Sequence, residues 1–172
     1  MLKCFFFDRD GVLIKNYGYV DEIKKLKFLK GAINAIKLLN KNKIKVIVIT
    51  NQSGIARGYF SEKKLLLFHK DINKILMKFN AKIDDFYYCP YHPSAKVKKY
   101  KKITNLRKPG NGMLLNAIKK YKLKPADCFM IGDEKKDFLS SVKTKISFQY
   151  KKNYSLDKQI KLLKILLIQC PY

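Results

Sequence analysis

Apolar residues along this chain follow two alternating patterns. Short runs of aromatic and β-branched residues, such as Cys4-Phe5-Phe6-Phe7 and Lys43 to Ile49, predict buried strands. Segments with apolar residues three and four positions apart, such as 31–41, predict helices. Strands that alternate with helices indicate an α/β fold, with a central parallel sheet covered by helices on both faces.

The remaining segments continue this alternation. Further strands are predicted over 83–89, 128–131 and 145–150, and further helices over 61–79, 112–121, 134–142 and 156–168. Ser61 is of a residue type preferred at helix N-caps, so it is predicted to cap the helix that begins there. The Leu and Ile positions of the last helix are expected to pack on the sheet. Residues 90–110 form a long polar loop rich in lysine. No change of composition marks a linker, so a single domain over 1–172 without a separate cap domain is predicted.

Polar residues stand where the predicted strands end. Asp8 and Asp10 follow the first strand, Thr50 and Asn51 end the second, and Asp133 follows Gly132 after the fourth. The carboxyl ends of parallel strands meet at one edge of a sheet, where α/β proteins bind ligands. Two carboxylates there can hold a hard cation such as Mg²⁺, and one can attack phosphorus. Alone, this first pattern would also fit an acidic turn.

Thr50 has a further part in this candidate site, and two other residues extend it. The hydroxyl of Thr50 and the backbone amides after it predict a phosphate cradle. Lys108 is a compact cation able to bridge a nucleophile and phosphoryl oxygens, although it could also be one of many surface lysines. Asp137 fits two interpretations equally: a carboxylate that holds the cation site through water, or an ordinary acidic residue at a helix N-terminus.

The charge of the chain is strongly positive, with 38 basic and 13 acidic residues and a net charge of +25. Such a charge suits nucleic-acid binding. We favour a compositional origin, because only Arg9, Arg57 and Arg107 are arginines and nucleic-acid grooves usually use arginine as well as lysine. Each of the three arginines falls in a motif, and its planar fork suits phosphate oxygens.

The expected location of the protein depends on three sequence features: membrane-spanning segments, a signal peptide and the pattern of cysteines. No apolar stretch is long enough to span a bilayer, and the N-terminal residues do not form a signal peptide. Scattered cysteines predict reduced thiols rather than a disulfide framework: Cys4, Cys89, Cys128 and Cys170. We therefore expect a cytoplasmic monomer without a membrane partner.

The motifs together resemble those of the haloacid dehalogenase superfamily over most of the chain, from Asp8 to Asp137. The segments D-R-D-G-V-L, T-N-Q-S-G-I-A-R-G, C-P-x-H-P and R-K-P-x-x-G-M further resemble one subgroup. This subgroup comprises the D-glycero-D-manno-heptose-1,7-bisphosphate 7-phosphatases and the histidinol-phosphate phosphatases. The resemblance implies a three-layer Rossmann-like fold and phosphatase chemistry.

The resemblance also implies roles for the acidic residues. Asp8 would attack phosphorus and form an aspartyl-phosphate, and Asp10 would protonate the leaving oxygen and then activate water. Mg²⁺ would be held by the Asp8 carboxylate, the Asp10 backbone carbonyl and Asp133. Neutralisation of the phosphoryl group would fall to Thr50, Asn51 and Lys108.

The same resemblance implies how the substrate is held. Arg107 would grip the far phosphate or the sugar. Residues 18–20 and the 90–106 loop would form the substrate rim.

Two features depart from the subgroup. Many members carry zinc in the long loop, but here Tyr91, Thr104 and Leu106 replace ligands. Cys89 and His92 supply at most two ligands, whereas structural zinc takes four, so a metal-free loop is predicted. Glu134 also stands where the bisphosphatases often have lysine. Its charge would either weaken phosphate binding or point to solvent, with Lys135 or Lys136 compensating it.

The sequence thus favours a Mg²⁺-dependent phosphatase that removes the 7-phosphate of a heptose 1,7-bisphosphate in nucleotide-heptose synthesis for surface polysaccharide. Histidinol phosphate or another small phosphate monoester is the alternative substrate. A polynucleotide 3′-phosphatase is less favoured, because the chain has no arginine outside its motifs. A non-catalytic nucleic-acid-binding protein is also less favoured, because a binding module does not need both Asp8 and Asp10.

Overall fold

The computed structural model describes residues 2–19 and 21–169, with side chains left out at 23 and 164–169. Its centre is a parallel sheet with the strand order β3-β2-β1-β4-β5. The strands are β1 (Cys4–Phe7), β2 (Lys45–Asn51), β3 (Asp85–Cys89), β4 (Cys128–Gly132) and β5 (Ser147–Tyr150). In the register of the sheet, Phe7 lies between Val48 of β2 and Ile131 of β4, so β1 ends at the same edge as its two neighbours, and β2 extends three residues further.

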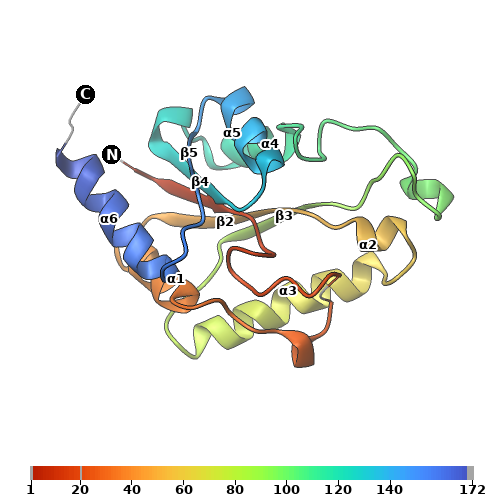
Figure 1. The fold of residues 1–172 in the computed structure, drawn as a ribbon, viewed down its shortest axis with the longest axis horizontal. Helices are drawn as coiled ribbons and strands as arrows, with labels where there is room; N and C mark the ends of the chain where they lie inside the picture. The colour runs from red at the N-terminus through yellow and green to blue at the C-terminus, as the bar shows by residue number, and fades with distance from the viewer. Residues whose placement is uncertain (1, 20, 170–172) are drawn as a thin grey trace.

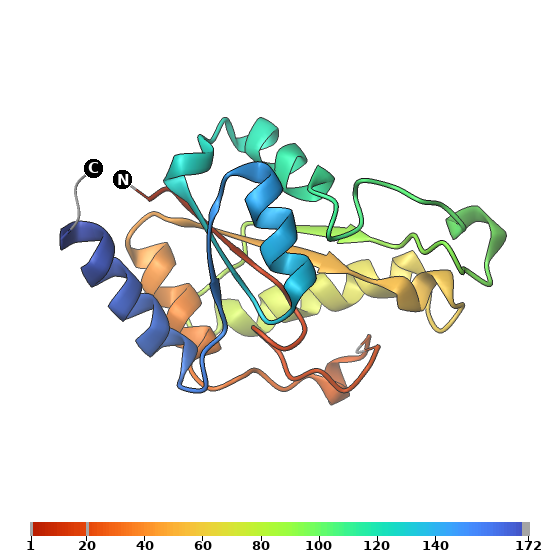
Figure 2. The same cartoon turned by 45° about the horizontal axis from the view of Figure 1, so that its top comes forward.

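Helices cover both faces of the sheet (Figures 1 and 2). One face carries α1 (Ala32–Lys41), α3 (Glu62–Met77) and α6 (Leu156–Gln169), and the other carries α4 (Gly112–Tyr121) and α5 (Lys135–Thr144). The short helix α2 (Ser53–Ala56) follows β2 directly. Three 3₁₀ turns complete the chain: η1 (Ile23–Lys25), η2 (Lys98–Tyr100) and η3 (Pro125–Asp127).

Alternate side chains of β1 supply the two cores. Phe5 and Phe7 point into the cluster under α1, α3 and α6, whereas Cys4 and Phe6 point into the cluster under α4. Because successive side chains of a strand face opposite sides, a run that is apolar at every position suits a strand with helices on both faces. The observed burial of all four residues confirms that interpretation.

The predicted elements match the observed ones to within a few residues. The Ser61 side chain accepts a hydrogen bond from the Lys64 backbone N–H at 3.2 Å, which confirms the N-cap of α3. The prediction for the last helix is also confirmed: α6 packs beside α1 and shares a core with the sheet residues Phe5 and Ile131. Gln159 of α6 also donates a hydrogen bond to the Tyr150 carbonyl of β5 at 2.9 Å. The buried residues Leu156 and Ile160 of α6 complete the core beside α1, so this helix extends a helical layer at the edge.

Two other features bear on the sequence predictions. No helix within 2–19 and 21–169 has the length and apolar character to cross a membrane. Cys4, Cys89 and Cys128 are buried and free, whereas Cys170 lies outside the described residues.

Candidate active site

A cavity of about 330 Å³ opens at the carboxyl edge of the sheet. It lies where β1, β2 and β4 end, which confirms the predicted convergence at this edge. The residues that line it are Asp8, Asp10, Asn16, Gly18, Tyr19, Thr50, Asn51, Gln52, Ser53, Glu134 and Lys136. Most of these residues carry polar or charged side chains, which suits a site for a phosphorylated ligand.

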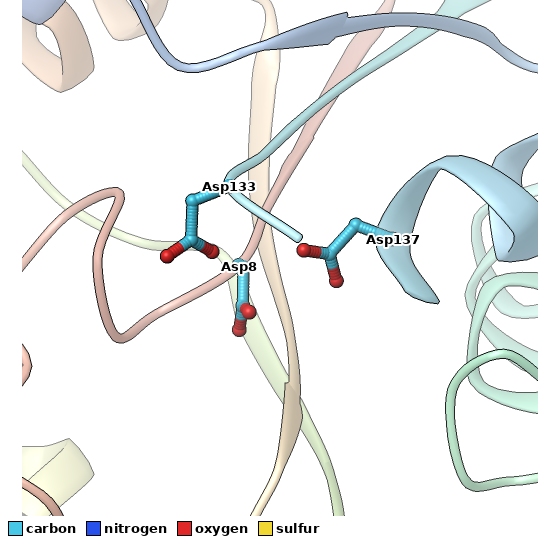
Figure 3. Close-up of side chains that lie close together, drawn as sticks. All are labelled: Asp8, Asp133 and Asp137. Carbon is cyan, nitrogen blue, oxygen red and sulfur yellow. The ribbon is translucent and has the colours of Figure 1, made fainter. Parts of the chain in front are cut away.

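Three carboxylates converge beside this cavity (Figure 3). Asp8 follows β1, Asp133 follows β4, and Asp137 projects from the first turn of α5; one oxygen from each lies within 4.8 Å of the others. Gly11 has φ +82°, and a Cβ there would lie only 2.0 Å from Asp133 Oδ2. The loop after Asp8 can therefore approach Asp133 this closely only with glycine at position 11.

Burial, and to a lesser extent the neighbouring charges, raises the pKa values of two of these carboxylates. Burial raises the pKa of Asp8 to about 7, with the charge of Asp137 acting in the same direction and Lys108 opposing both. Burial, together with the charges of Asp137 and Glu134, raises the pKa of Asp133 to about 6. Asp8 and Asp137 are buried and Asp133 is exposed, and three such carboxylates that repel one another are the donor set of a hard cation such as Mg²⁺. The residues present therefore fit a Mg²⁺ site.

Lys108 lies buried between two of these carboxylates. Its ammonium is 3.0 Å from Asp8 Oδ2 and 2.6 Å from Asp137 Oδ1, and it donates to the Ile49 carbonyl at 2.8 Å. Burial alone would lower the pKa of Lys108, but the charges of Asp8 and Asp137 raise it above its ordinary value. Lys108 therefore contacts Asp8, the residue predicted to be the nucleophile, and it is not a surface residue.

Asp137 combines two functions that the sequence left open. Its Oδ2 accepts the Glu134 backbone N–H at 3.1 Å, as in a helix capping box, while its Oδ1 contacts Lys108. A Cβ at position 132 would lie 2.3 Å from the Asp137 Cβ, so Gly132 allows α5 to begin against the end of β4. Asp137 is thus both a helix N-terminal acid and part of the carboxylate cluster.

The two residues at the end of β2 act differently from each other. Thr50 is buried, and its hydroxyl oxygen accepts a hydrogen bond from Gln52 Nε2 at 3.0 Å, which leaves the hydroxyl proton to be donated. The Asn51 amide instead exchanges two hydrogen bonds of 3.0 Å with the backbone of Lys108. The Asn51 side chain thus holds the lysine loop in place, and Asn51 also lines the cavity. Its contact with a phosphoryl group stays a prediction.

Asp10 lies apart from the carboxylate cluster. Its carboxylate accepts hydrogen bonds from Arg9 Nε at 3.2 Å and from Arg9 Nη2 and Gln52 Nε2 at 3.0 Å. The prediction that the arginine fork of Arg9 suits phosphate oxygens was wrong. Arg9 is buried and binds a carboxylate, because the β1 end directs its side chain toward α3 rather than into the cavity.

The predicted substrate residues only partly reach the cavity. Gly18 and Tyr19 line it, and Val20 lies outside the described residues. Among the lining residues named above, none belongs to the 90–106 loop, and Arg107 is also absent. Arg107 donates to the Tyr91 carbonyl at 3.3 Å, and burial, together with the charge of Arg57, lowers its pKa.

The long loop is held by aromatic packing, and it extends beyond β3 (Figure 2). Tyr100 packs into a cluster with Ile55 and Phe60, and its hydroxyl donates to Glu62 Oε1 at 2.6 Å. In the part of the chain that the structure describes, the one grouping of three or more potential metal ligands is the aspartate cluster. His92 Nδ1 instead accepts the Ser94 backbone N–H.

Reasoning from the sequence missed Gln52 but anticipated the ion pair of Glu134 at the cavity rim. Gln52 links Thr50 to Asp10, and its only sequence signal was its place in T-N-Q-S-G. Glu134 is exposed, and Lys136 lies 2.6 Å from its Oε1, so the predicted compensation of the Glu134 charge is confirmed with Lys136 as the partner.

Comparison with known proteins agrees with this geometry. The family model described as polynucleotide kinase 3 phosphatase matches residues 3–160. A D-glycero-beta-D-manno-heptose-1,7-bisphosphate 7-phosphatase of Haemophilus influenzae is 42% identical over 146 residues, which cover 85% of this chain and 79% of that protein. The Escherichia coli protein of the same name is 36% identical, over 82% of this chain and 74% of its own length.

Solved structures show the same fold. A HAD-like phosphatase from Mesorhizobium loti superposes with a TM-score of 0.79 and 28% identity, over 84% of this chain and 69% of that one. The D,D-heptose 1,7-bisphosphate phosphatase of B. bronchiseptica, solved with magnesium and phosphate, has a TM-score of 0.78 and 23% identity. That alignment covers 96% of this chain and 99% of the other.

A parallel sheet that presents Asp8, Lys108 and Asp133 at one edge defines a phosphatase of the haloacid dehalogenase superfamily. Within it, the chain belongs to the polynucleotide kinase 3 phosphatase family, with curated relatives that are heptose-bisphosphate phosphatases.

Proposed function

We propose that this protein removes the 7-phosphate of D-glycero-D-manno-heptose 1,7-bisphosphate through an aspartyl-phosphate. The observation that carries the proposal is the buried contact of 3.0 Å between Lys108 and Asp8 at the cavity, in a chain 42% identical to an enzyme of that name. The product would enter nucleotide-heptose synthesis in the cytoplasm. We also propose that residues 1–172 act as one domain and as a monomer, with the 90–110 loop in place of a cap.

Asp8 is the proposed nucleophile because both of its oxygens are held. Oδ1 accepts the Arg9 backbone N–H at 2.7 Å, and Oδ2 contacts Lys108. Attack forms an oxygen–phosphorus bond and breaks the phosphorus–oxygen bond to the sugar, whose oxygen takes a proton from Asp10. Water then attacks phosphorus, Asp10 receives the proton, and Asp8 is released with inorganic phosphate.

Charge on the transferring group is neutralised by Lys108 and by the hydroxyl of Thr50. The carboxylates of Asp8 and Asp133, with the Asp10 backbone carbonyl, would hold Mg²⁺, and Asp137 would support them through water. When bound, the ion supplies further positive charge for the phosphoryl oxygens. Arg107 is proposed to hold the far phosphate or the sugar.

The test is phosphate release with Mg²⁺ from both anomers of the heptose bisphosphate, histidinol phosphate and a 3′-phosphorylated oligonucleotide. We expect a preference for one heptose anomer, with ³¹P NMR showing loss of the 7-phosphate and retention of the 1-phosphate. Asp8→Asn should abolish turnover without changing the circular dichroism spectrum. Asp71→Asn, an exposed carboxylate of α3 paired with Lys74, is the matched control and should keep full activity.

Two results would contradict the proposal in different ways. Turnover that favours histidinol phosphate would contradict the heptose bisphosphate as the substrate but would agree with the proposed phosphatase chemistry. Activity in Asp8→Asn would remove Asp8 as the nucleophile.

A second candidate, a polynucleotide 3′-phosphatase, is favoured by the description of the matching family and by the net charge of +25. Release of phosphate from the oligonucleotide at a rate above that for the heptose would support it. Binding to this DNA should then weaken steeply with salt.

A further inference from the structure

Arg9 connects the carboxylate of Asp10 to the helix α3. Its guanidinium binds Asp10 through Nε at 3.2 Å and Nη2 at 3.0 Å, and Nη2 also donates to Gln52 Oε1 at 3.1 Å. The Arg9 side chain is 1% exposed. Arginine has the planar fork that this two-point contact needs, and lysine does not.

The other side of the guanidinium is fixed by α3. Its central carbon lies 5.2 Å from the Phe68 ring centroid, and Nη1 lies 3.3 Å from His69 Nε2. Burial, together with the Arg9 charge, lowers the pKa of His69 to about 3, so the ring is neutral and Nε2 accepts the hydrogen bond. The His69 ring is itself stacked on Phe86, with centroids 4.3 Å apart. Arg9 therefore cannot swing without disturbing the core.

Gln52 closes the arrangement from the cavity side. Its Nε2 donates to Asp10 Oδ2 and to Thr50 Oγ1, both at 3.0 Å. Asp10 Oδ2 thus accepts two of these hydrogen bonds and Oδ1 accepts one. Of the two oxygens, Oδ1 has the freer lone pairs, and Asp10 lines the cavity.

We propose that Arg9 and Gln52 are positioning residues that hold the Asp10 carboxylate at the leaving-group side of the cavity. This inference rests on the proposed phosphatase function. It assigns to the arginine of D-R-D-G a part in the reaction without contact to the substrate. The positioning of Asp10 by Arg9 and Gln52 matters most for substrates whose leaving oxygen needs a proton.

The dependence on the leaving group makes the proposal testable. When the phosphorus–oxygen bond to a sugar breaks, its electron pair goes to the leaving oxygen, which needs the proton of Asp10 at that moment. p-Nitrophenolate is a stable anion and leaves without a proton. A misplaced Asp10 therefore slows phosphoryl transfer from a sugar phosphate and spares p-nitrophenyl phosphate.

The experiment measures kcat/KM for p-nitrophenyl phosphate and for the heptose bisphosphate, because kcat/KM reports the steps up to departure of the leaving group. The quantity compared between variants is the ratio of the two kcat/KM values, sugar phosphate over aryl phosphate. Since a positioned acid contributes roughly 10²- to 10⁴-fold, we expect Arg9→Lys to lose about 10- to 100-fold on the sugar phosphate and much less on the aryl phosphate. Gln52→Leu should shift the ratio in the same direction.

A double variant separates positioning from a general loss of structure. Asp10→Asn alone should show the same selective loss, and adding Arg9→Lys to it should change the ratio no further, because both act on one carboxylate. Asn73→Leu is the matched control on α3: it breaks two hydrogen bonds with the Ile83 backbone and should leave the ratio unchanged.

Equal loss on both substrates in Arg9→Lys and Gln52→Leu would overturn the proposal. A further change of the ratio in the double variant would do the same. If Arg9→Lys does not fold, the ratio of kcat/KM values for the two substrates measured in Gln52→Leu tests the proposal. Wild-type protein without activity on either substrate would contradict the proposed function itself.

Discussion

His69 makes the stability of the fold depend on pH in a way that can be calculated. The ring is 3% exposed, and burial, with the Arg9 charge, lowers its pKa from 6.5 to about 3. The folded state therefore binds fewer protons than the unfolded state between these two values. A group with a depressed folded pKa contributes stability that is present above the unfolded pKa and lost as the pH falls.

The magnitude follows from the proton linkage. Each pH unit below 6.5 costs about 1.4 kcal/mol of unfolding free energy until the folded pKa is reached. Between pH 7 and pH 5, His69 should thus remove about 2 kcal/mol. That is a large part of the roughly 5–15 kcal/mol by which proteins of this kind are stable.

The assay is urea unfolding at pH 7 and pH 5 in EDTA, for wild type and for His69→Gln. Gln keeps a hydrogen-bond acceptor for Arg9 and does not titrate. The carboxylates contribute almost equally in both proteins, so the difference between the two pH shifts isolates His69. We expect wild type to lose about 2 kcal/mol more than His69→Gln.

The other histidine is the control for this measurement. The chain has two histidines, and His92 is partly exposed. His92→Gln should keep most of the wild-type loss. If His69→Gln loses as much stability as wild type between pH 7 and pH 5, His69 is not held neutral, and its contact with Arg9 is not as described.

Three further predictions concern the cation site and the loop. Lys108→Met should abolish phosphate release and lower the free energy of unfolding by about 3–5 kcal/mol, because it leaves the carboxylates of Asp8 and Asp137 buried without their cation. Urea unfolding that matches wild type would contradict the ion pairs of Lys108 with these two residues. Mg²⁺ should raise the melting temperature more at pH 8 than at pH 5.5, because Asp8, with a pKa of about 7, and Asp133, with a pKa of about 6, bind the ion when they are ionised. An equal rise of the melting temperature at both pH values, or a rise that persists in Asp133→Asn, would place the ion elsewhere. Protein purified without added metal should contain no stoichiometric zinc by ICP-MS, because Cys89 and His92 alone offer two ligands, and one zinc per chain would refute this.

Periodicity predicted the elements well because each strand and helix carries its own pattern. The burial of every residue in Cys4–Phe7 and the spacing of Ala32, Ala35, Ile36 and Leu39 are local properties of the sequence. The convergence of Asp8, Thr50 and Asp133 also followed, since parallel strands must end at one edge. For α6 the periodicity indicated a buried face but not its neighbours: the helix lies beside α1 and contributes to the core on the same face of the sheet.

The orientation of polar side chains was beyond such reasoning. Arg9 and Asn51 have partners 43 and 57 residues away in the sequence, so no local pattern could show that they bind Gln52 and Lys108. Both carry groups that suit a phosphate, and both are used by the protein itself. A motif fixes which residues stand at a strand end, but packing decides which of them face the ligand.

The charges at the site suggest why such a lysine-rich protein should need a cation. Asp8, Asp10, Asp133 and Asp137 meet two buried cations, Arg9 and Lys108, which leaves two negative charges when all are ionised. One divalent ion balances these charges, and Glu134 and Lys136 neutralise each other at the rim. The net charge of +25 draws phosphate esters to the surface, yet the cavity itself repels them until the carboxylates are matched. Binding of the ion and binding of the phosphorylated substrate should therefore be coupled, and each should tighten the other.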